Sequence, residues 1–135
     1  NVFSGNDKAT VVTDTGIISD DILHRIDDST LLVLEANYDP HMLRFGPYQP
    51  FLKQRVASDE GHLSNEMAAQ ALLMMKRPDF MQVILAHRSE NNNNAVLVTQ
   101  TIGKMLVDGG VRIGPEMKLQ HGQPNEIVSM QSIKR

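Results

Sequence analysis

The stretch Phe80-Met81-Gln82-Val83-Ile84-Leu85-Ala86-His87-Arg88-Ser89 decides the fold that we predict for this chain. It follows a break at Pro78-Asp79, and residues 81–85 are apolar except for Gln82. A short and partly β-branched run of this kind is typical of a strand buried on both faces of a mostly parallel sheet. The stretch therefore predicts an α/β protein in which His87 follows the carboxyl end of a central strand.

Two further predicted strands also end on polar residues. Residues 8–13 lead into Asp14, and residues 31–34 lead into Glu35. Open α/β sheets collect their binding and catalytic groups just beyond the carboxyl ends of their strands. We therefore predict a functional rim that includes these two carboxylates and His87. The alternative is that they are only the polar loop residues that any sheet carries.

Helices are predicted between the strands, and two polar residues mark where two of them begin. Ser19 is the expected N-cap of the first helix, and either Ser64 or Asn65 is the expected N-cap of a later one. After residue 111, two short runs joined by a Gly- and Pro-containing turn predict a hairpin of strands at 117–121 and 127–133. The expected helices cover residues 19–26, 40–45, 51–57, 64–76 and 96–107.

A polar loop at residues 58–65 contains His62. This histidine lies just ahead of a predicted helix N-terminus, where anions bind readily. It is therefore a candidate for the rim. His24 lies off the apolar stripe of the first helix, and His121 lies far along the chain from the rim, so both are predicted to be surface residues.

The charge of the chain restricts how it could contact nucleic acid. Its formal net charge is −3, so no global basic field exists and any such contact must use a local patch. Lys53 and Arg55, with the aromatic residues near them, form one basic and aromatic patch around residues 51–57. We interpret this patch as a solvated helix face, with contact to a phosphate backbone as the alternative.

Composition limits the class of protein and the kind of metal site. A length of 135 residues without an internal repeat or linker predicts a single domain, residues 1–135. No apolar run approaches the length of a membrane span, and we expect a cytoplasmic protein. The absence of cysteine leaves His, Asp and Glu as metal ligands. The start, Asn1-Val2-Phe3-Ser4, is not a secretion signal and suggests a chain that begins partway through a larger protein.

Four segments occur in the order and spacing of a known family. They resemble the carboxyl-terminal half of metallo-β-lactamase-fold hydrolases of the YycJ-like (WalJ or VicX) group, and they are similar to the tRNA 3′-processing endonucleases of the same superfamily. Tyr38 departs from the histidine usual in the group, and the family's upstream His-x-His-x-Asp-His motif does not occur in these residues. The segments, within about residues 8–106, are Thr13-Asp14-Thr15-Gly16, Leu34-Glu35-Ala36-Asn37-Tyr38-Asp39, Ser58-Asp59-Glu60-Gly61-His62-Leu63-Ser64-Asn65 and Leu85-Ala86-His87-Arg88-Ser89-Glu90-Asn91-Asn92.

The resemblance implies a fold and a dinuclear metal centre. The chain would form half of a four-layer αββα metallo-β-lactamase sandwich, with the other half, which carries the remaining ligands, as its partner. Asp14 would bridge two divalent metal ions, and His87 would be the last histidine ligand of one of them. Zinc is the expected metal, with manganese as the alternative.

The resemblance also implies roles for residues that do not hold the metals. Glu35 and His62 would form a catalytic pair near the leaving oxygen. Asn37, Ser64 and Asn65 are candidates for substrate binding, by positioning either the phosphate or the loop.

The implied activity is metal-dependent phosphodiester hydrolysis of DNA, with a 5′-to-3′ exonuclease as the specific form. Two alternatives remain open at this point: a hydrolase of the same fold acting on a small ester, thioester or lactone, and a non-catalytic half-domain that binds a partner. Two ions need about six or seven protein donors, so the chain expressed alone should bind zinc weakly and show no hydrolysis. A homo-oligomer is also left open.

Overall fold

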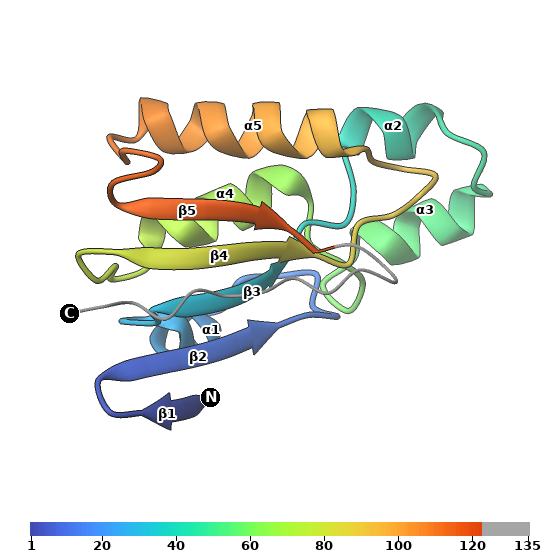
Figure 1. Ribbon diagram of the computed structural model, residues 1–135. Helices are drawn as coiled ribbons and strands as arrows, with labels where there is room; N and C mark the ends of the chain where they lie inside the picture. The colour runs from blue at the N-terminus through green and yellow to red at the C-terminus, as the bar shows by residue number, and fades with distance from the viewer. Residues whose placement is uncertain (123–135) are drawn as a thin grey trace.

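A computed structural model describes residues 1–122 of the chain and shows one five-stranded sheet with the strand order β1-β2-β3-β4-β5 (Figure 1). The short edge strand β1 is antiparallel to β2, and the other four strands are parallel to one another. The predicted α/β class is therefore confirmed. The strands are β1 (Val2–Ser4), β2 (Asp7–Val12), β3 (Leu31–Glu35), β4 (Met81–Ala86) and β5 (Met117–His121).

Strand β1 was not predicted, although the sequence contains a signal for it. Its three residues, Val2, Phe3 and Ser4, are too few to show apolar alternation, and all three are exposed. Ser4 pairs with Asp7 across the two-residue turn Gly5-Asn6, and Gly5 has a φ of 60°. A Gly-Asn turn between two β-prone segments is typical of a hairpin. The predicted strand at 127–133 lies outside the described residues.

The helices follow the predicted segments closely. Ser19 accepts a hydrogen bond from the backbone N of Ile22, so its predicted role as N-cap is confirmed. Of the two candidates for the N-cap of α4, the structure selects Ser64, which accepts a hydrogen bond from the backbone N of Met67. Helix α4 ends two residues before the predicted position, because Met75 is extended and the Arg77 guanidinium donates to the last carbonyls of the helix. The helices are α1 (Asp20–Ile26), α2 (Pro40–Phe45), α3 (Pro50–Ala57), α4 (Asn65–Met74) and α5 (Ala95–Asp108).

The two faces of the sheet are covered differently. Helices α1, α4 and α5 lie on one face, where they enclose the core (Figure 1). The core side chains of the two central strands are Leu32, Leu34, Val83 and Leu85, all buried. On the opposite face, Val11, Val33 and Ile84 are aligned by the strand register, but Val11 is 66% exposed and the other two are half-buried. Strand β4 was predicted to be buried on both faces. On this second face the prediction holds for Gln82, which is buried, but only in part for Ile84, which is half-buried.

The strand directions decide where the loops meet. Strands β2, β3 and β4 are neighbours and run parallel, so their carboxyl ends lie at the same edge of the sheet. Helices α2 and α3 lie beyond this edge rather than over the sheet (Figure 1). Within residues 1–122, no helix is both long enough and apolar enough to cross a membrane.

Candidate functional site

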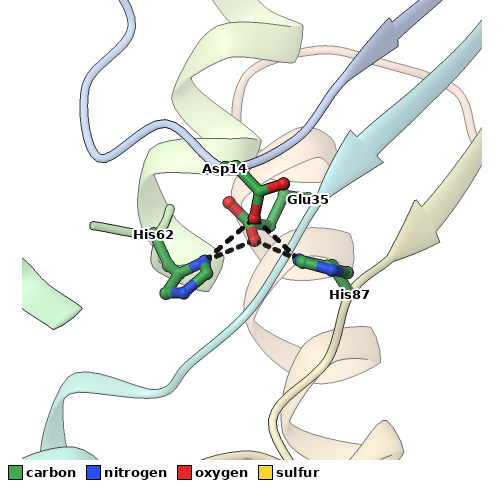
Figure 2. A group of neighbouring side chains, drawn as sticks. All are labelled: Asp14, Glu35, His62 and His87. Atoms are coloured by element: carbon green, nitrogen blue, oxygen red, sulfur yellow. Dashed lines mark hydrogen bonds and ion pairs between the residues drawn. The ribbon is translucent and has the colours of Figure 1, made fainter. Parts of the chain in front are cut away.

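Four side chains converge at the carboxyl edge of the sheet (Figure 2). Glu35 is the last residue of β3, Asp14 and His87 follow the ends of β2 and β4, and His62 precedes α4. One possible ligand atom from each residue lies within 4.8 Å of the others. The structure therefore brings the predicted metal residues and the predicted catalytic pair into one cluster. Neither His24 nor His121 is part of it.

Glu35 connects the two histidines. Its side chain is fully buried, and its Oε1 lies 2.7 Å from Nδ1 of His62 and 2.7 Å from Nδ1 of His87. Its Oε2 accepts a hydrogen bond of 3.2 Å from the backbone N of Leu63. A buried carboxylate needs such donors, because burial removes its hydration. When each imidazole donates from Nδ1 to Glu35, its Nε2 is left for another partner. Sequence reasoning paired Glu35 with His62 alone and missed the second histidine on the same oxygen.

Asp14 lies nearer to His87 than to His62. Its Oδ1 is 3.5 Å from His87 Nδ1 and 3.9 Å from His62 Nδ1, and its side chain is 68% exposed (Figure 2). Ligand atoms of a tetrahedral zinc site lie about 3.4 Å apart, given zinc–ligand bonds of about 2.1 Å. The separation between Asp14 and His87 is close to this value, but the same Nδ1 of His87 lies at a hydrogen-bond distance of 2.7 Å from Glu35. While this nitrogen donates to Glu35, an ion could bind His87 only through Nε2.

The four residues have the donor chemistry of a metal site. Carboxylate oxygens and imidazole nitrogens are ligands that zinc and manganese accept. Asp14 and His87 are the two that could bind an ion directly, while Glu35 lies where it can orient the imidazoles, as the outer carboxylates of metal sites do. Two ions need about six or seven protein donors, more than this cluster supplies.

The backbone at two of the four residues adopts a left-handed conformation. Asp14 has a φ of 58° and His87 a φ of 59°, which costs a non-glycine residue about 1–2 kcal/mol. Asp28, in the turn before β3, has a φ of 59°, so this conformation does not by itself mark a site. Contacts between loops hold both site residues. The backbone N of Gly16 donates to Asp59 O over 2.9 Å, which fixes the Asp14 turn against the His62 loop.

Asn37 holds the backbone at His87 and just after it. Its Nδ2 donates to His87 O over 2.7 Å, and its own carbonyl accepts from Ser89 N over 2.8 Å. The side chain of this predicted substrate-binding residue is therefore engaged with the loop that carries His87. Its contact with a phosphate stays a prediction.

The other two predicted substrate-binding residues also bond within the protein. Ser64 caps α4, and Asn65 is fully buried. The amides of Asn65 and Asn93 exchange hydrogen bonds of 3.0 Å and 2.8 Å, and Asn93 Nδ2 also donates to Ala36 O. This pairing joins the starts of α4 and α5 behind the site. Sequence reasoning missed Asn93, and the only signal for it was its place in the run of four asparagines.

His62 is fixed by the main chain. Its backbone N donates to Val56 O over 2.9 Å, at the end of α3. A Cβ on the preceding Gly61 would lie 2.2 Å from the carbonyl oxygens of both Arg55 and Val56, so only glycine fits there. The close approach of α3 to this glycine therefore decides where His62 stands.

A cavity of about 1140 Å³ opens beside the cluster. His62 and His87 line it at the cluster, Tyr48 and Val56 line it at the helices, and residues 88–95 line its remaining wall. The asparagines of this wall, with Arg88 and Glu90, make it polar. The cavity is large enough for a small-molecule ligand or for one or two nucleotides.

His121, predicted as a surface residue, is half-buried at the end of β5 and its Nε2 lies 2.9 Å from Thr99 Oγ1. Burial lowers the pKa of His121, and the charge of Arg88 lowers it further. His24 is exposed, as predicted.

The fold and the cluster define an α/β protein with a histidine–carboxylate site at the carboxyl edge of its sheet. Comparison with curated proteins is more specific. The chain is 32% identical over 130 residues to the exodeoxyribonuclease YycJ of Bacillus anthracis, an alignment that covers 96% of this chain and 49% of that protein. It is 33% identical over 132 residues to the exodeoxyribonuclease WalJ of two strains of Streptococcus pneumoniae, which covers 97% of this chain and 49% of each relative.

The resemblance to the YycJ-like group that the motifs predict is therefore confirmed. The chain spans about half the length of the curated relatives it matches. No family model matches the chain, and no solved structure matches it.

Proposed function

We propose that this chain contributes to a metal-dependent nuclease that hydrolyses phosphodiester bonds in DNA. The observation that carries the proposal is the convergence of Asp14, Glu35, His62 and His87 at one edge of the sheet. The names of the relatives, which are exodeoxyribonucleases, support DNA as the substrate. We extend the proposal to a 5′-to-3′ exonuclease with two metal ions, zinc or manganese.

The proposed fold is half of an αββα metallo-β-lactamase sandwich. The sheet face that carries Val11, Val33 and Ile84 supports it, because residues 1–122 leave this apolar row partly exposed. In the sandwich, this face would pack against the second sheet. Asp14 and His87 would hold metal together with ligands from that other half. A divalent ion bound there supplies a bound water whose pKa is lowered to about 7.

His62 would act on the leaving oxygen. Its Nδ1 donates to Glu35, so its Nε2 is the nitrogen that can carry a proton toward the substrate. As the phosphorus–oxygen bond breaks, the proton on Nε2 passes to the leaving oxygen and the imidazole becomes neutral. Glu35 keeps the ring in one orientation throughout. Such a proton transfer is commonly worth about 10²–10⁴-fold in rate.

The test measures activity of the protein at its natural length with added zinc or manganese. Linear DNA labelled at one end, a small chromogenic phosphodiester and a lactone are offered separately. We expect nucleotides to be released from the 5′ end of the DNA and the lactone to be left intact. Hydrolysis of the lactone but not of DNA would instead favour a hydrolase of small esters. DNA binding without any hydrolysis, at full metal content, would favour a non-catalytic binding domain.

A further inference from the structure

The segment that contains α2 and α3, residues 40–58, differs in charge from the rest of the chain. It contains Arg44, Lys53 and Arg55 and no Asp or Glu, whereas the whole chain has a formal charge of −3. We call the outer surface of this segment the α2–α3 surface. No ion pair with a carboxylate is found for these three side chains within residues 1–122. Lys53 Nζ donates to Arg44 O over 2.7 Å, a contact that does not neutralise its charge. The three charges are therefore available to an anionic partner.

The same surface exposes aromatic rings. Phe45 is 68% exposed and Phe51 is 61% exposed, and α3 buries none of its residues. The chain has only four Phe and two Tyr, so two large exposed rings in one short segment are a marked concentration. The Arg44 guanidinium lies 5.4 Å from the centre of the Phe45 ring. Exposed rings beside cations that have no carboxylate partner are the combination that binds single-stranded nucleic acid, because bases stack on the rings and phosphates contact the cations.

The α2–α3 surface is joined directly to both histidine loops. Helix α3 holds His62 through the hydrogen bond from His62 N to Val56 O. The start of α2 is joined to the loop after His87, because Asp39 N donates to Asn92 O over 2.8 Å. A nucleic-acid strand bound on this surface would therefore keep a fixed position relative to the cluster.

The cavity connects the α2–α3 surface with the cluster of Asp14, Glu35, His62 and His87. It is lined by Tyr48, between α2 and α3, and by His62 and His87 of the cluster. Figure 1 shows both helices beyond the carboxyl ends of the strands, on the side where the cluster lies. A duplex keeps its base faces stacked inside, so the exposed rings favour a single strand over a duplex.

We propose that the α2–α3 surface binds the single-stranded part of a DNA substrate and leads it into the cavity. Bases stack on Phe45 and Phe51, and phosphates contact Arg44, Lys53 and Arg55. This inference rests on the proposed function for the identity of the nucleic acid. Binding can nevertheless be measured without hydrolysis, so the two can fail separately.

The experiment measures the binding of a fluorescently labelled single-stranded DNA oligonucleotide by anisotropy, in the presence of a chelator so that no hydrolysis occurs. One variant combines Phe45→Ala with Phe51→Ala, and a second replaces Arg44, Lys53 and Arg55 by Gln. We expect the first to weaken binding by about tenfold or more. The second should weaken binding and lower the salt dependence of log Kd by about two, as expected for three lost phosphate contacts.

Matched controls come from other surfaces of the chain. Phe3→Ala removes a ring that is also 68% exposed and also lies near a cation, Lys8, but on β1. Replacing Arg25, Lys76 and Lys104 by Gln removes three exposed cations that already pair with carboxylates. Both controls should bind like the parent. Each single variant, Phe45→Ala or Phe51→Ala, is measured as well, in case the double variant does not fold.

Equal binding by the parent and the α2–α3 variants would overturn the inference and leave this surface to a protein partner. An equal loss in the control variants would overturn it too, because binding would then be spread over the whole molecule. If the parent binds single-stranded DNA through this surface but hydrolyses no DNA with metal restored, the inference stands and the proposed function fails.

Discussion

His62 and His87 reach the same oxygen of Glu35 over equal distances, yet their backbones are held in different ways. His62 is held by a main-chain hydrogen bond to Val56 and is 31% exposed at its side chain. His87 has a left-handed φ of 59°, is held by the side chain of Asn37 and is 50% exposed. His87 also lies nearer to Asp14 than His62 does. This difference is the one expected if, as proposed above, His87 holds metal and His62 donates a proton.

The largest effect is expected when a proposed metal ligand, Asp14 or His87, is removed. In the protein at its natural length, Asp14→Ala should remove a bridging ligand and lower both metal content and rate. His87→Ala should empty one metal position more than the other, because an imidazole there serves a single ion. Metal content is measured by elemental analysis, with His121→Ala as the control histidine outside the cluster. Parental metal content in both variants would mean that these residues have only a structural role.

His62→Ala tests the proposed proton donor. This change should lower the rate without changing the metal content. We expect kcat to fall by about 10²–10⁴-fold, because a proton donor to the leaving oxygen is lost. Metal content should equal that of the parent. If metal is lost in proportion to activity, His62 is also a ligand and the two histidines are equivalent. If metal and activity both remain, His62 is a loop residue.

Glu35→Gln should act on both histidines, but by less than the loss of either. The amide keeps one acceptor oxygen and removes the charge, so we expect a fall in kcat of about 10-fold. Combining it with His62→Ala should add little, because the two residues act as one unit on the leaving oxygen. A double-mutant cycle in kcat measures this. Fully additive losses would show that Glu35 acts mainly through His87.

The smallest effect is expected at Asn37. It should appear in metal affinity and not in kcat. Asn37→Ala removes the donor that holds His87 O, and metal affinity should fall by about 10-fold, as it does for outer residues that orient ligands. At saturating metal, kcat should approach that of the parent, since His62 is held by α3. Asn37→Leu keeps a similar volume, adds no charge and has no donor, so it should behave like Asn37→Ala. Normal affinity in Asn37→Leu would assign the effect to packing.

Much of the fold could be predicted because its signals are local. An apolar run such as residues 81–85 identifies a buried strand, and polar residues at the strand ends mark the rim. The order and spacing of the motifs also predicted the YycJ-like resemblance, which the curated relatives confirm. Strand β1 escaped prediction because a three-residue exposed strand has no periodicity, and its pairing depends on the turn alone.

The sequence by itself determined the α/β class, the N-cap at Ser19 and the residues that stand at the strand ends, and it narrowed the N-cap of α4 to Ser64 or Asn65. These features depend on neighbours only a few positions away, where propensity and hydrogen-bonding reach decide the outcome. Only the tertiary structure decided that His62 and His87, which are 27 and 52 residues from Glu35, share one carboxylate oxygen. The register of parallel strands and the packing of α3 against Gly61 set these positions, and no local pattern in the chain encodes the distance between the two loops.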